Sequence, residues 1–213
     1  MKRILLFMIM VSAISINGQK IGELAPEKPL EKFPLNSWGI DILVGESGFG
    51  LGTFYRYSFT NTTTGFVNFS ISESKDEREF EYIDWYGQSY VVGKKNRVFF
   101  LPVNFGLQYR MFEKTVTENL RPYINAGVGP TFLITSPYEK EFFNSLGYAR
   151  MEYAVGGYIG LGANFGLSKS NLVGLNIRYY MAHIFGQGVE NLENKYRKNI
   201  STFYITLNLG VMY

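Results

Sequence analysis

Residues 201–213 read STFYITLNLGVMY and end the chain. Every second residue of this stretch is apolar, namely Phe203, Ile205, Leu207, Leu209 and Val211. The residues between them are mostly small or polar. An apolar residue at every second position indicates a β-strand with one apolar face. The stretch therefore predicts a strand that runs to the last residue, Tyr213.

The same period-two pattern continues towards the N-terminus as far as residue 38 and predicts an all-β protein. No segment carries a convincing repeat of 3.6 residues, which would indicate an amphipathic helix. The predicted strands cover approximately residues 38–45, 50–59, 65–73, 97–112, 121–134, 151–167, 171–184 and 199–213.

The connections between the predicted strands alternate in length. Short ones follow the second, fourth and sixth strands: TNTTT (60–64), EKTVTEN (113–119) and SKS (168–170). Long ones follow the third, fifth and seventh: ESKDEREFEYIDWYGQSYVVGKKN (73–96), TSPYEKEFFNSLGYAR (135–150) and FGQGVENLENKYRKN (185–199). The first connection, near GESG (45–48), is short although it lies on the long-loop side. Short turns at one end and long loops at the other are typical of a bacterial outer-membrane barrel.

Alternation alone fits two kinds of barrel, because a soluble barrel such as a lipocalin turns its apolar face inward and a membrane barrel turns it outward. The polar faces of the four predicted strands within residues 97–184 contain no lysine. Lysines beyond residue 19 lie in the predicted linker, loops or turns. A solvated face normally carries lysine and glutamate, whereas charge on a lipid face costs roughly 2–4 kcal/mol at mid-depth. The polar face is therefore interpreted as a packed lumen.

Large residues share the predicted inner face with many glycines. We expect Phe100, Tyr158, Tyr180 and Tyr204 to lie over glycines of neighbouring strands, because glycine within a strand marks close approach. Eight strands leave an interior just wide enough for side chains to fill. The sequence thus predicts an eight-stranded antiparallel up-and-down transmembrane β-barrel, with short periplasmic turns, longer extracellular loops and a filled lumen.

The N-terminal residues MKRILLFMIMVSAISINGQ have the charged start and short apolar core of a secretory signal. We predict a signal peptide at residues 1–18, a proline-containing periplasmic linker at 19–37 and the barrel at 38–213. Export would place this barrel in the outer membrane of a Gram-negative bacterium.

The overall composition excludes several functional classes. The formal net charge is only +3, and this balance does not favour nucleic-acid binding. The chain has no cysteine and one histidine, which argues against disulfides and structural zinc. We expect no catalytic residues, no metal and no cofactor.

The strand sequences resemble the small outer-membrane β-barrel proteins of the OmpA/OmpX-like superfamily, in the form common in Bacteroidota. The resemblance covers about residues 38–213 and is a pattern of residue types. It is carried by LPVNFGLQYRMF (101–112), RPYINAGVGPTFLI (121–134), YIGLGANFGL (158–167), VGLNIRYYMAHI (173–184) and LNLGVMY (207–213).

This resemblance implies partners for the barrel. They are the outer-membrane lipids and the barrel-insertion machinery, which reads an alternating last strand with an aromatic end, usually Phe. The residues of this insertion signal would be Phe203, Leu207, Leu209, Val211 and Tyr213. Some eight-stranded barrels are lipid A deacylases with a serine two residues after a histidine; here Phe185 follows His183 at that spacing, so we expect a histidine without catalytic function at the rim.

Charged residues on the predicted inner face must be paired or they cost several kcal/mol each. We predict a polar network in the lumen from Asp41, Arg56, Arg110, Glu152 and Arg178, with Arg121 and Glu152 nearer the ends. The alternative is a narrow anion-preferring passage, because rings of arginine select anions.

The loop at residues 73–96 is acidic, then aromatic, then basic. Its aromatic residues are predicted to bind a partner, and a partner could also add a strand to an exposed edge of this loop. These residues are Tyr82, Trp85, Tyr86 and Tyr90. The alternative is a solvated loop that contacts only lipopolysaccharide sugars, or nothing. The leading hypothesis for the whole protein is a structural or interaction role, in which the extracellular loops bind an extracellular or periplasmic protein partner or a component of the envelope. Three alternatives remain: a narrow transport passage, an accessory of a secretion system and, as a minor alternative, a soluble lipid-carrying barrel.

Overall fold

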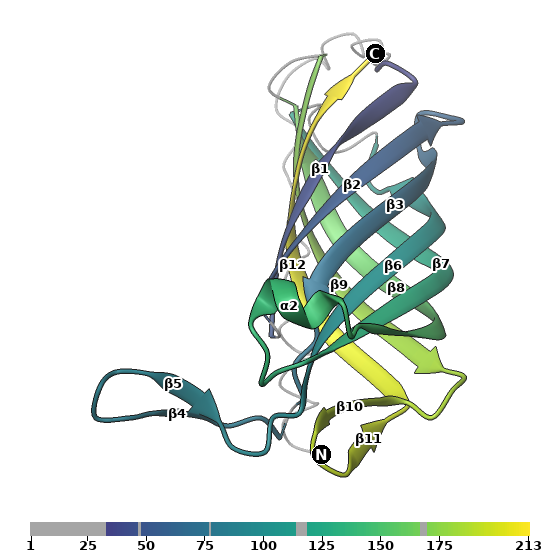
Figure 1. The fold of residues 1–213 in the computed structure, drawn as a ribbon. Coiled ribbons are helices and arrows are strands. Elements are labelled where there is room, and N and C mark those ends of the chain that lie inside the picture. Colours follow the sequence, from purple (N-terminus) through teal and green to yellow (C-terminus); the bar gives the residue numbers. More distant parts are fainter. Residues whose placement is uncertain (1–32, 47, 77, 114–118, 167–169) are drawn as a thin grey trace, which may run out of the picture. The chain divides into compact units, whose positions relative to one another are not determined.

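The structure is a computed structural model, and it describes residues 33–46, 48–76, 78–113, 119–166 and 170–213. The signal peptide and most of the linker that the sequence predicts lie outside these residues. Eight antiparallel strands close into one barrel in the order β1-β12-β9-β8-β7-β6-β3-β2 (Figure 1). They are β1 (Asn36–Gly45), β2 (Gly48–Ser58), β3 (Thr63–Glu73), β6 (Asn96–Arg110), β7 (Leu120–Pro137), β8 (Arg150–Phe165), β9 (Asn171–Ile184) and β12 (Asn199–Met212).

The two ends of the barrel differ in their connections, as the sequence predicts. The turn end carries connections 59–62, 111–119 and 166–170, and the loop end carries 46–47, 74–95, 138–149 and 185–198. The loop end holds two hairpins and a helix (Figure 1). These are β4 (Glu81–Ile83) with β5 (Ser89–Val91), β10 (Val189–Leu192) with β11 (Lys195–Arg197), and α2 (Phe142–Leu146). Within the described residues, no helix has both the length and the apolar character needed to cross a membrane.

The last strand closes the barrel against the first. Pairs run from Ser37 with Met212 to Gly45 with Tyr204. Beyond the strand, the backbone groups of Asn36 and Tyr213 exchange two hydrogen bonds of 3.0 and 2.9 Å. Strands β1 and β12 are therefore paired along their shared edge. The strand predicted from residues 201–213 closes the barrel, and neither β1 nor β12 is an edge strand.

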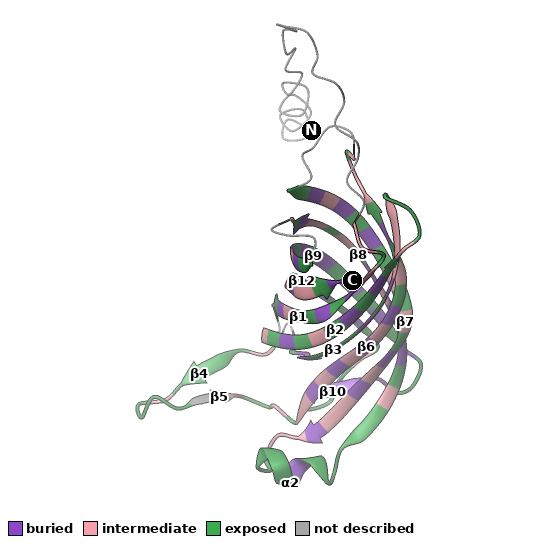
Figure 2. Cartoon of the chain, turned by 90° about the horizontal axis from the view of Figure 1, so that it is seen from above, coloured by how far each residue is buried: buried purple, intermediate pink, exposed green. Residues whose placement is uncertain are grey.

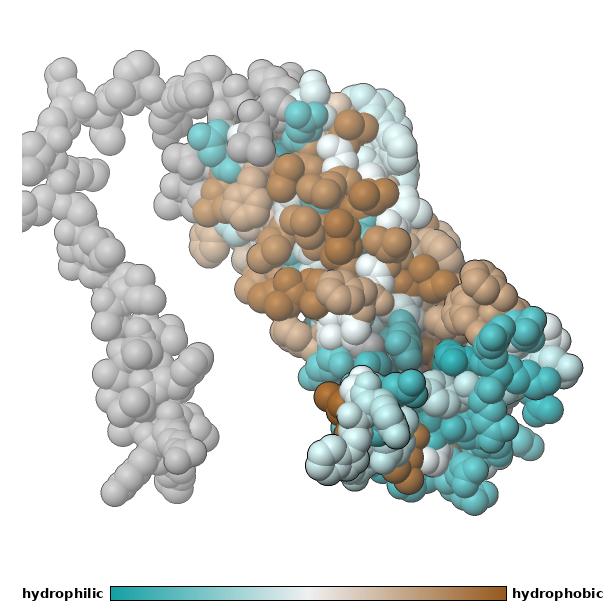
Figure 3. Space-filling view, turned by 60° about the vertical axis from the view of Figure 1, so that its left-hand side comes forward, coloured by the Kyte–Doolittle hydropathy of each residue, from teal (hydrophilic) through white to brown (hydrophobic). Residues whose placement is uncertain are grey.

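The apolar residues of the strands point outward, and the polar ones point inward. In β6, Asn104 and Gln108 are buried, whereas Phe105 and Leu107 are exposed. Figure 2 shows the same alternation of buried and exposed residues along the strands. In Figure 3, hydrophobic side chains cover the barrel wall and hydrophilic ones gather at the loop end. The predicted orientation is confirmed, and it is the reverse of that of a soluble barrel.

Tyrosines lie over glycines inside the barrel. A β-carbon at Gly156 would lie 2.7 Å from the ring of Tyr180, and one at Gly127 would lie 3.2 Å from Tyr158. Tyr204 covers Gly45 in the same way. The expectation is confirmed for these three tyrosines, and at Gly45 and Gly156 a β-carbon would collide with the tyrosine ring. No described glycine is covered by Phe100, which packs edge-on against Tyr180 at 5.1 Å between ring centroids.

Some boundaries differ from those read from the sequence. Strand β1 begins at Asn36, inside the predicted linker, and Phe33 packs against Phe54, Leu172 and Met212. The short helix α2 has no counterpart in the sequence analysis, because it is too short to show a repeat. Strands β6 and β8 end two residues earlier than predicted.

Candidate functional site

The middle of the lumen contains a buried ion pair between strands β1 and β9. Arg178 Nη2 donates to Asp41 Oδ2 over 3.0 Å, and both side chains are almost fully buried. The other carboxylate oxygen, Asp41 Oδ1, accepts from the side-chain amide of Asn208. Two buried charges that satisfy each other avoid the cost of an isolated one. The structure therefore brings two of the five predicted network residues into direct contact, and it adds Asn208, which the prediction does not include.

A chain of hydrogen bonds continues across the barrel from the ring of Tyr158, which lies under the guanidinium of Arg178 at 5.1 Å. Asn68 Nδ2 donates to the hydroxyl of Tyr158 over 2.9 Å. Asn104 Nδ2 donates to Asn68 Oδ1 over 3.0 Å, and the Tyr180 hydroxyl donates to Asn104 Oδ1 over 2.9 Å. These bonds join strands β3, β6, β8 and β9 through the interior.

The aromatic rings of the lumen complete this filling. Phe66 stacks on Tyr158 at 6.0 Å, and Tyr158 stacks on Tyr180 at 6.1 Å. Tyr123, which is fully buried, donates its hydroxyl to Asn208 Oδ1 over 3.3 Å. We call this set the lumen plug: Asp41, Phe66, Asn68, Asn104, Tyr123, Tyr158, Arg178, Tyr180 and Asn208. The members of the plug are therefore hydrogen-bonded and packed on one another inside the barrel.

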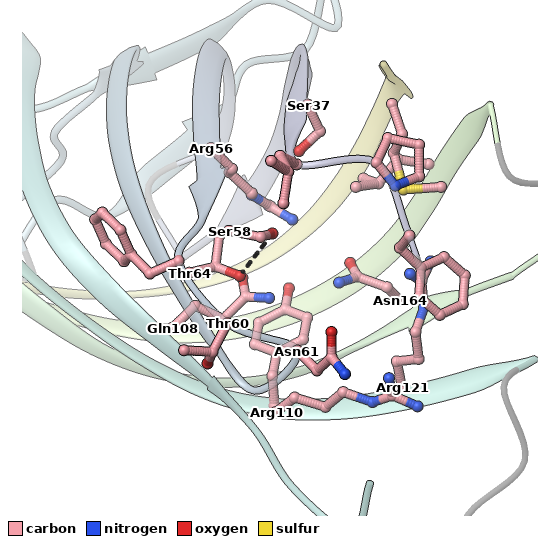
Figure 4. Close-up of a pocket in the computed structure, with 17 residues that line it drawn as sticks. Ser37, Arg56, Ser58, Thr60, Asn61, Thr64, Gln108, Arg110, Arg121 and Asn164 are labelled. Carbon is pink, nitrogen blue, oxygen red and sulfur yellow. Dashed lines mark hydrogen bonds between the residues drawn. The ribbon is translucent and has the colours of Figure 1, made fainter. Parts of the chain in front are cut away.

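Within the described residues, the other three predicted network residues form no ion pair with Asp41 or Arg178, although Arg56 is hydrogen-bonded to Tyr123 of the plug. Arg56 and Arg110 line a cavity at the turn end together with Arg121 (Figure 4). Glu152 lines a different cavity at the loop end, among residues such as Lys95 and Arg150. The five residues therefore do not meet in one cluster: Arg56 is linked to the plug through Tyr123, whereas Arg110 and Glu152 lie at opposite ends of the barrel. The alternating sequence pattern predicts that all five residues face the lumen. It does not predict how far along the barrel each one lies.

A second polar cluster ties the long loops together at the loop end. Asp76 accepts from Arg78 Nε and Nη2, both over 2.8 Å, and forms an ion pair of 3.2 Å with Arg197. Asn191 donates to the backbone oxygen of Ser74 over 2.7 Å, and Arg197 donates to Asn191 over 2.8 Å. The connections 74–95 and 185–198 are thus joined by buried polar contacts.

Two lysines add further links to this cluster. Lys94 lies 3.1 Å from Glu79 and 3.5 Å from Glu73, and Lys95 lies 2.7 Å from Glu190. We call the cluster the loop clasp: Glu73, Ser74, Asp76, Arg78, Glu79, Lys94, Lys95, Glu190, Asn191 and Arg197. None of these residues was predicted from the sequence, because loop residues carry no periodic signal that reports their partners. The clasp fixes the base from which the β4–β5 hairpin extends.

The β4–β5 hairpin carries all four predicted loop-binding residues. Tyr82 and Tyr90 are cross-strand partners whose rings stack at 5.9 Å. In the turn, Asp84 Oδ1 accepts the backbone N–H groups of Tyr86 and Gln88, both over 2.8 Å. Gly87 has φ of +75°, which glycine adopts at little cost. The turn presents Trp85 and Tyr86, which are almost completely exposed.

Two other predicted features have simple positions. His183 is exposed at the loop end of β9, where its Nδ1 lies 2.6 Å from Asn199 Oδ1. Of the predicted insertion signal, Phe203, Val211 and Tyr213 are exposed on the outer wall, and Leu207 and Leu209 are partly covered. The alternation of the last strand therefore appears as an outward apolar stripe.

Acid is expected to loosen the loop clasp only at very low pH. The hydrogen bond from Arg78 is the main reason why the pKa of Asp76 falls from 3.8 to about 2. A depressed pKa of a carboxyl group stabilises the folded state above its ordinary pKa, and this contribution is lost as the pH falls through the folded value. Amide hydrogen exchange in residues 185–198, corrected for intrinsic rates, should be slower in the native protein than in Asp76→Asn at pH 5. The difference should shrink between about pH 4 and pH 2; an equal difference at pH 5 and pH 2 would contradict the assignment.

No protein-family model matches the chain, and no curated protein matches it. Solved structures match most of its length. Ail, the attachment invasion locus protein of Yersinia pestis, is 15% identical, with 84% of this chain and 96% of that chain covered and a TM-score of 0.45. The N-terminal β-barrel domain of Pseudomonas aeruginosa OprF is 12% identical, with 85% and 100% covered and a TM-score of 0.46. The outer membrane protein OprG from Pseudomonas aeruginosa is 11% identical, with 84% and 95% covered and a TM-score of 0.40.

These structures are outer-membrane barrels, and the similarity to them concerns fold alone. The strand pairing and the outward apolar face show independently that the chain has the fold of an eight-stranded outer-membrane β-barrel. The similarity to these solved structures does not indicate a role for this protein.

Proposed function

We propose that the protein resides in the outer membrane of a Gram-negative bacterium and binds a protein partner through the β4–β5 hairpin. The outward apolar residues support the location, because a wall of Ile, Leu, Val and Phe is stable against lipid and unstable in water. The loop end would face the outside of the cell and the turn end the periplasm. Export by the predicted signal peptide and insertion through the last strand belong to the same proposal.

The lumen plug supports a role other than transport. Its buried rings and hydrogen-bonded amides occupy the centre of the barrel, and eight strands leave little space beyond what side chains fill. The three arginines of the predicted network do not form one ring, because Arg178 is paired with Asp41 while Arg56 and Arg110 lie at the turn end. We therefore favour an interaction protein over the narrow passage.

The observation that carries the proposal is the exposed aromatic turn of the hairpin. Trp85 and Tyr86 project from a turn that Asp84 holds in shape, and the clasp holds the hairpin at its base. Tryptophan and tyrosine are enriched among residues that dominate binding energy. The strands β4 and β5 pair only with each other among the described residues, so each also offers a free edge for strand addition.

Photo-crosslinking on whole cells tests this assignment. A photoreactive amino acid at position 85 is expected to give a discrete crosslinked product, whereas one at Phe143 of α2, which is also largely exposed, is not. Changing Tyr86→Ser should weaken this product, in line with a loss of roughly tenfold in affinity for an aromatic anchor. Asp84 and Gly87 stay in place, so the turn is preserved. No product at position 85, or equal products at 85 and 143, would contradict the proposal.

A further inference from the structure

The turn end of the barrel contains a cavity of about 180 Å³ with three arginines (Figure 4). Arg56 comes from β2, Arg110 from the end of β6 and Arg121 from the start of β7. Arg56 and Arg121 are only 4% and 7% exposed. We call this cavity the arginine pocket; its other polar side chains include Ser37, Ser58, Thr60, Asn61, Thr64, Gln108, Tyr123 and Asn164.

The described residues that line the arginine pocket provide no negative charge. Neither aspartate nor glutamate is among them. Asp41, the acidic residue of the lumen plug, is already engaged with Arg178 and Asn208. Arg121 also experiences Coulomb repulsion from Arg110 and Arg56. Like charges that are withdrawn from water and held together destabilise the fold unless something compensates them.

The N–H groups of the arginines are only partly used. Buried nitrogens without a hydrogen-bond partner among the described residues are Arg56 Nη1, Arg110 Nε, and Arg121 Nε and Nη2. The ring of Phe33 lies 4.1 Å from the guanidinium carbon of Arg121 and 5.9 Å from that of Arg110. Such stacking engages the face of a guanidinium, whereas its N–H groups lie in the plane and remain available.

We propose that the arginine pocket binds an oxyanion of the phosphate class. Planar guanidinium groups donate pairs of N–H bonds that match the oxygens of phosphate, and one such anion would satisfy several donors at once. The side-chain amides of Gln108 and Asn164 add donors, because an amide can present its NH2 group as well as its oxygen. Towards the centre, Tyr123 bonds to Asn208 of the plug, so the pocket is a binding site closed on its inner side.

A phosphate group could reach the arginine pocket from two sources. One is free phosphate in the periplasm, and the other is the headgroup of a phospholipid in the inner leaflet. Both offer the same oxygens to the arginines. The choice between these two sources rests on the proposed location of the turn end in the periplasm. Anion binding itself is separate from the proposed partner binding, because the pocket lies at the end of the barrel opposite the β4–β5 hairpin.

Calorimetric titration of the mature protein in an uncharged maltoside detergent tests the proposal. Inorganic phosphate is expected to bind at one site, and chloride at equal ionic strength is not. The changes Arg121→Gln and Arg56→Gln should each weaken phosphate binding at least about tenfold, as expected for charge-assisted bonds. Arg150→Gln, at the loop end and outside the pocket, is the matched control and should bind phosphate as the unchanged protein does.

Short-chain phosphatidylglycerol in the same detergent separates the two sources. If it binds with dependence on Arg121 and inorganic phosphate does not, the anion is a lipid headgroup; the reverse result identifies free phosphate. A second readout guards against misfolding: in buffer without phosphate, Arg121→Gln should unfold no faster than the unchanged protein, since it removes an uncompensated charge. The proposal is overturned if neither ligand binds, or if binding is as tight in both pocket variants as in the control.

Discussion

The change Asp41→Asn is expected to lower the free energy of unfolding by about 3–5 kcal/mol, because it leaves a buried arginine without its counter-charge. Asp41 is 1% exposed, and it joins Arg178 of β9 to Asn208 of β12 in the centre of the plug. The substitution keeps the volume of the side chain, so the loss reports charge rather than packing. The loss of stability is measured by urea unfolding in detergent micelles, with the gel mobility of the folded barrel as the readout.

The double variant Asp41→Asn with Arg178→Met is the control for this experiment. It removes both charges, and replacing both members of a buried pair by uncharged groups is often close to neutral. Most of the lost stability should therefore return. If the single and the double variant were equally unstable, the ion pair would not be the reason for the loss. An unchanged midpoint in Asp41→Asn would show that Arg178 is solvated in the folded protein.

The second large effect is expected on the outer wall. Changing Ile177→Arg places a charge near the middle of β9, between Leu161 of β8 and Ile205 of β12. An arginine at mid-depth on the lipid face of a barrel costs about 2–4 kcal/mol. The equilibrium between unfolded chain and barrel inserted in phosphatidylcholine vesicles should shift by that amount.

The matched control for this charge is Phe185→Arg, in the loop directly after β9. Phe185 is also exposed, but it lies at the loop end, where charges on a barrel cost about 0–1 kcal/mol. Equal effects at positions 177 and 185 would mean that the wall does not cross a hydrocarbon layer.

The fold was largely predictable because one physical rule applies to every strand of the barrel. Side chains alternate between lumen and wall, so residues such as Asn104 and Leu107 reveal their faces by position alone. The lack of lysine on the polar face then distinguished a packed lumen from a solvated surface. Segments without that period were missed: α2 has one turn, and the hairpin β10–β11 lies in a loop rich in charged and polar residues.

The partners within the lumen were less predictable than the face. The sequence identifies Asp41, Arg56 and Arg178 as inward, but which residues meet depends on the register and on the height of each strand in the barrel. Asp41 pairs directly with Asn208 in the ladder between β1 and β12, while Arg178 reaches it from β9. Arg56 lies on the inner face too, yet near the turn end. Any two residues on the inner face are therefore candidates for contact. Which of them meet is determined by how the strands pair when the barrel closes.

The outer wall of the barrel is expected to contact lipid, and nitroxide accessibility tests this contact most directly. The chain has no cysteine, so single cysteines at Leu175, Ile177 and Tyr179 of β9 can be labelled without background. After reconstitution in vesicles, collisions with oxygen should be frequent and greatest at position 177, and collisions with a water-soluble nickel chelate should be rare there. A label at Trp85 in the hairpin should show the opposite. Free access of the chelate to position 177, equal to that at position 85, would contradict the account.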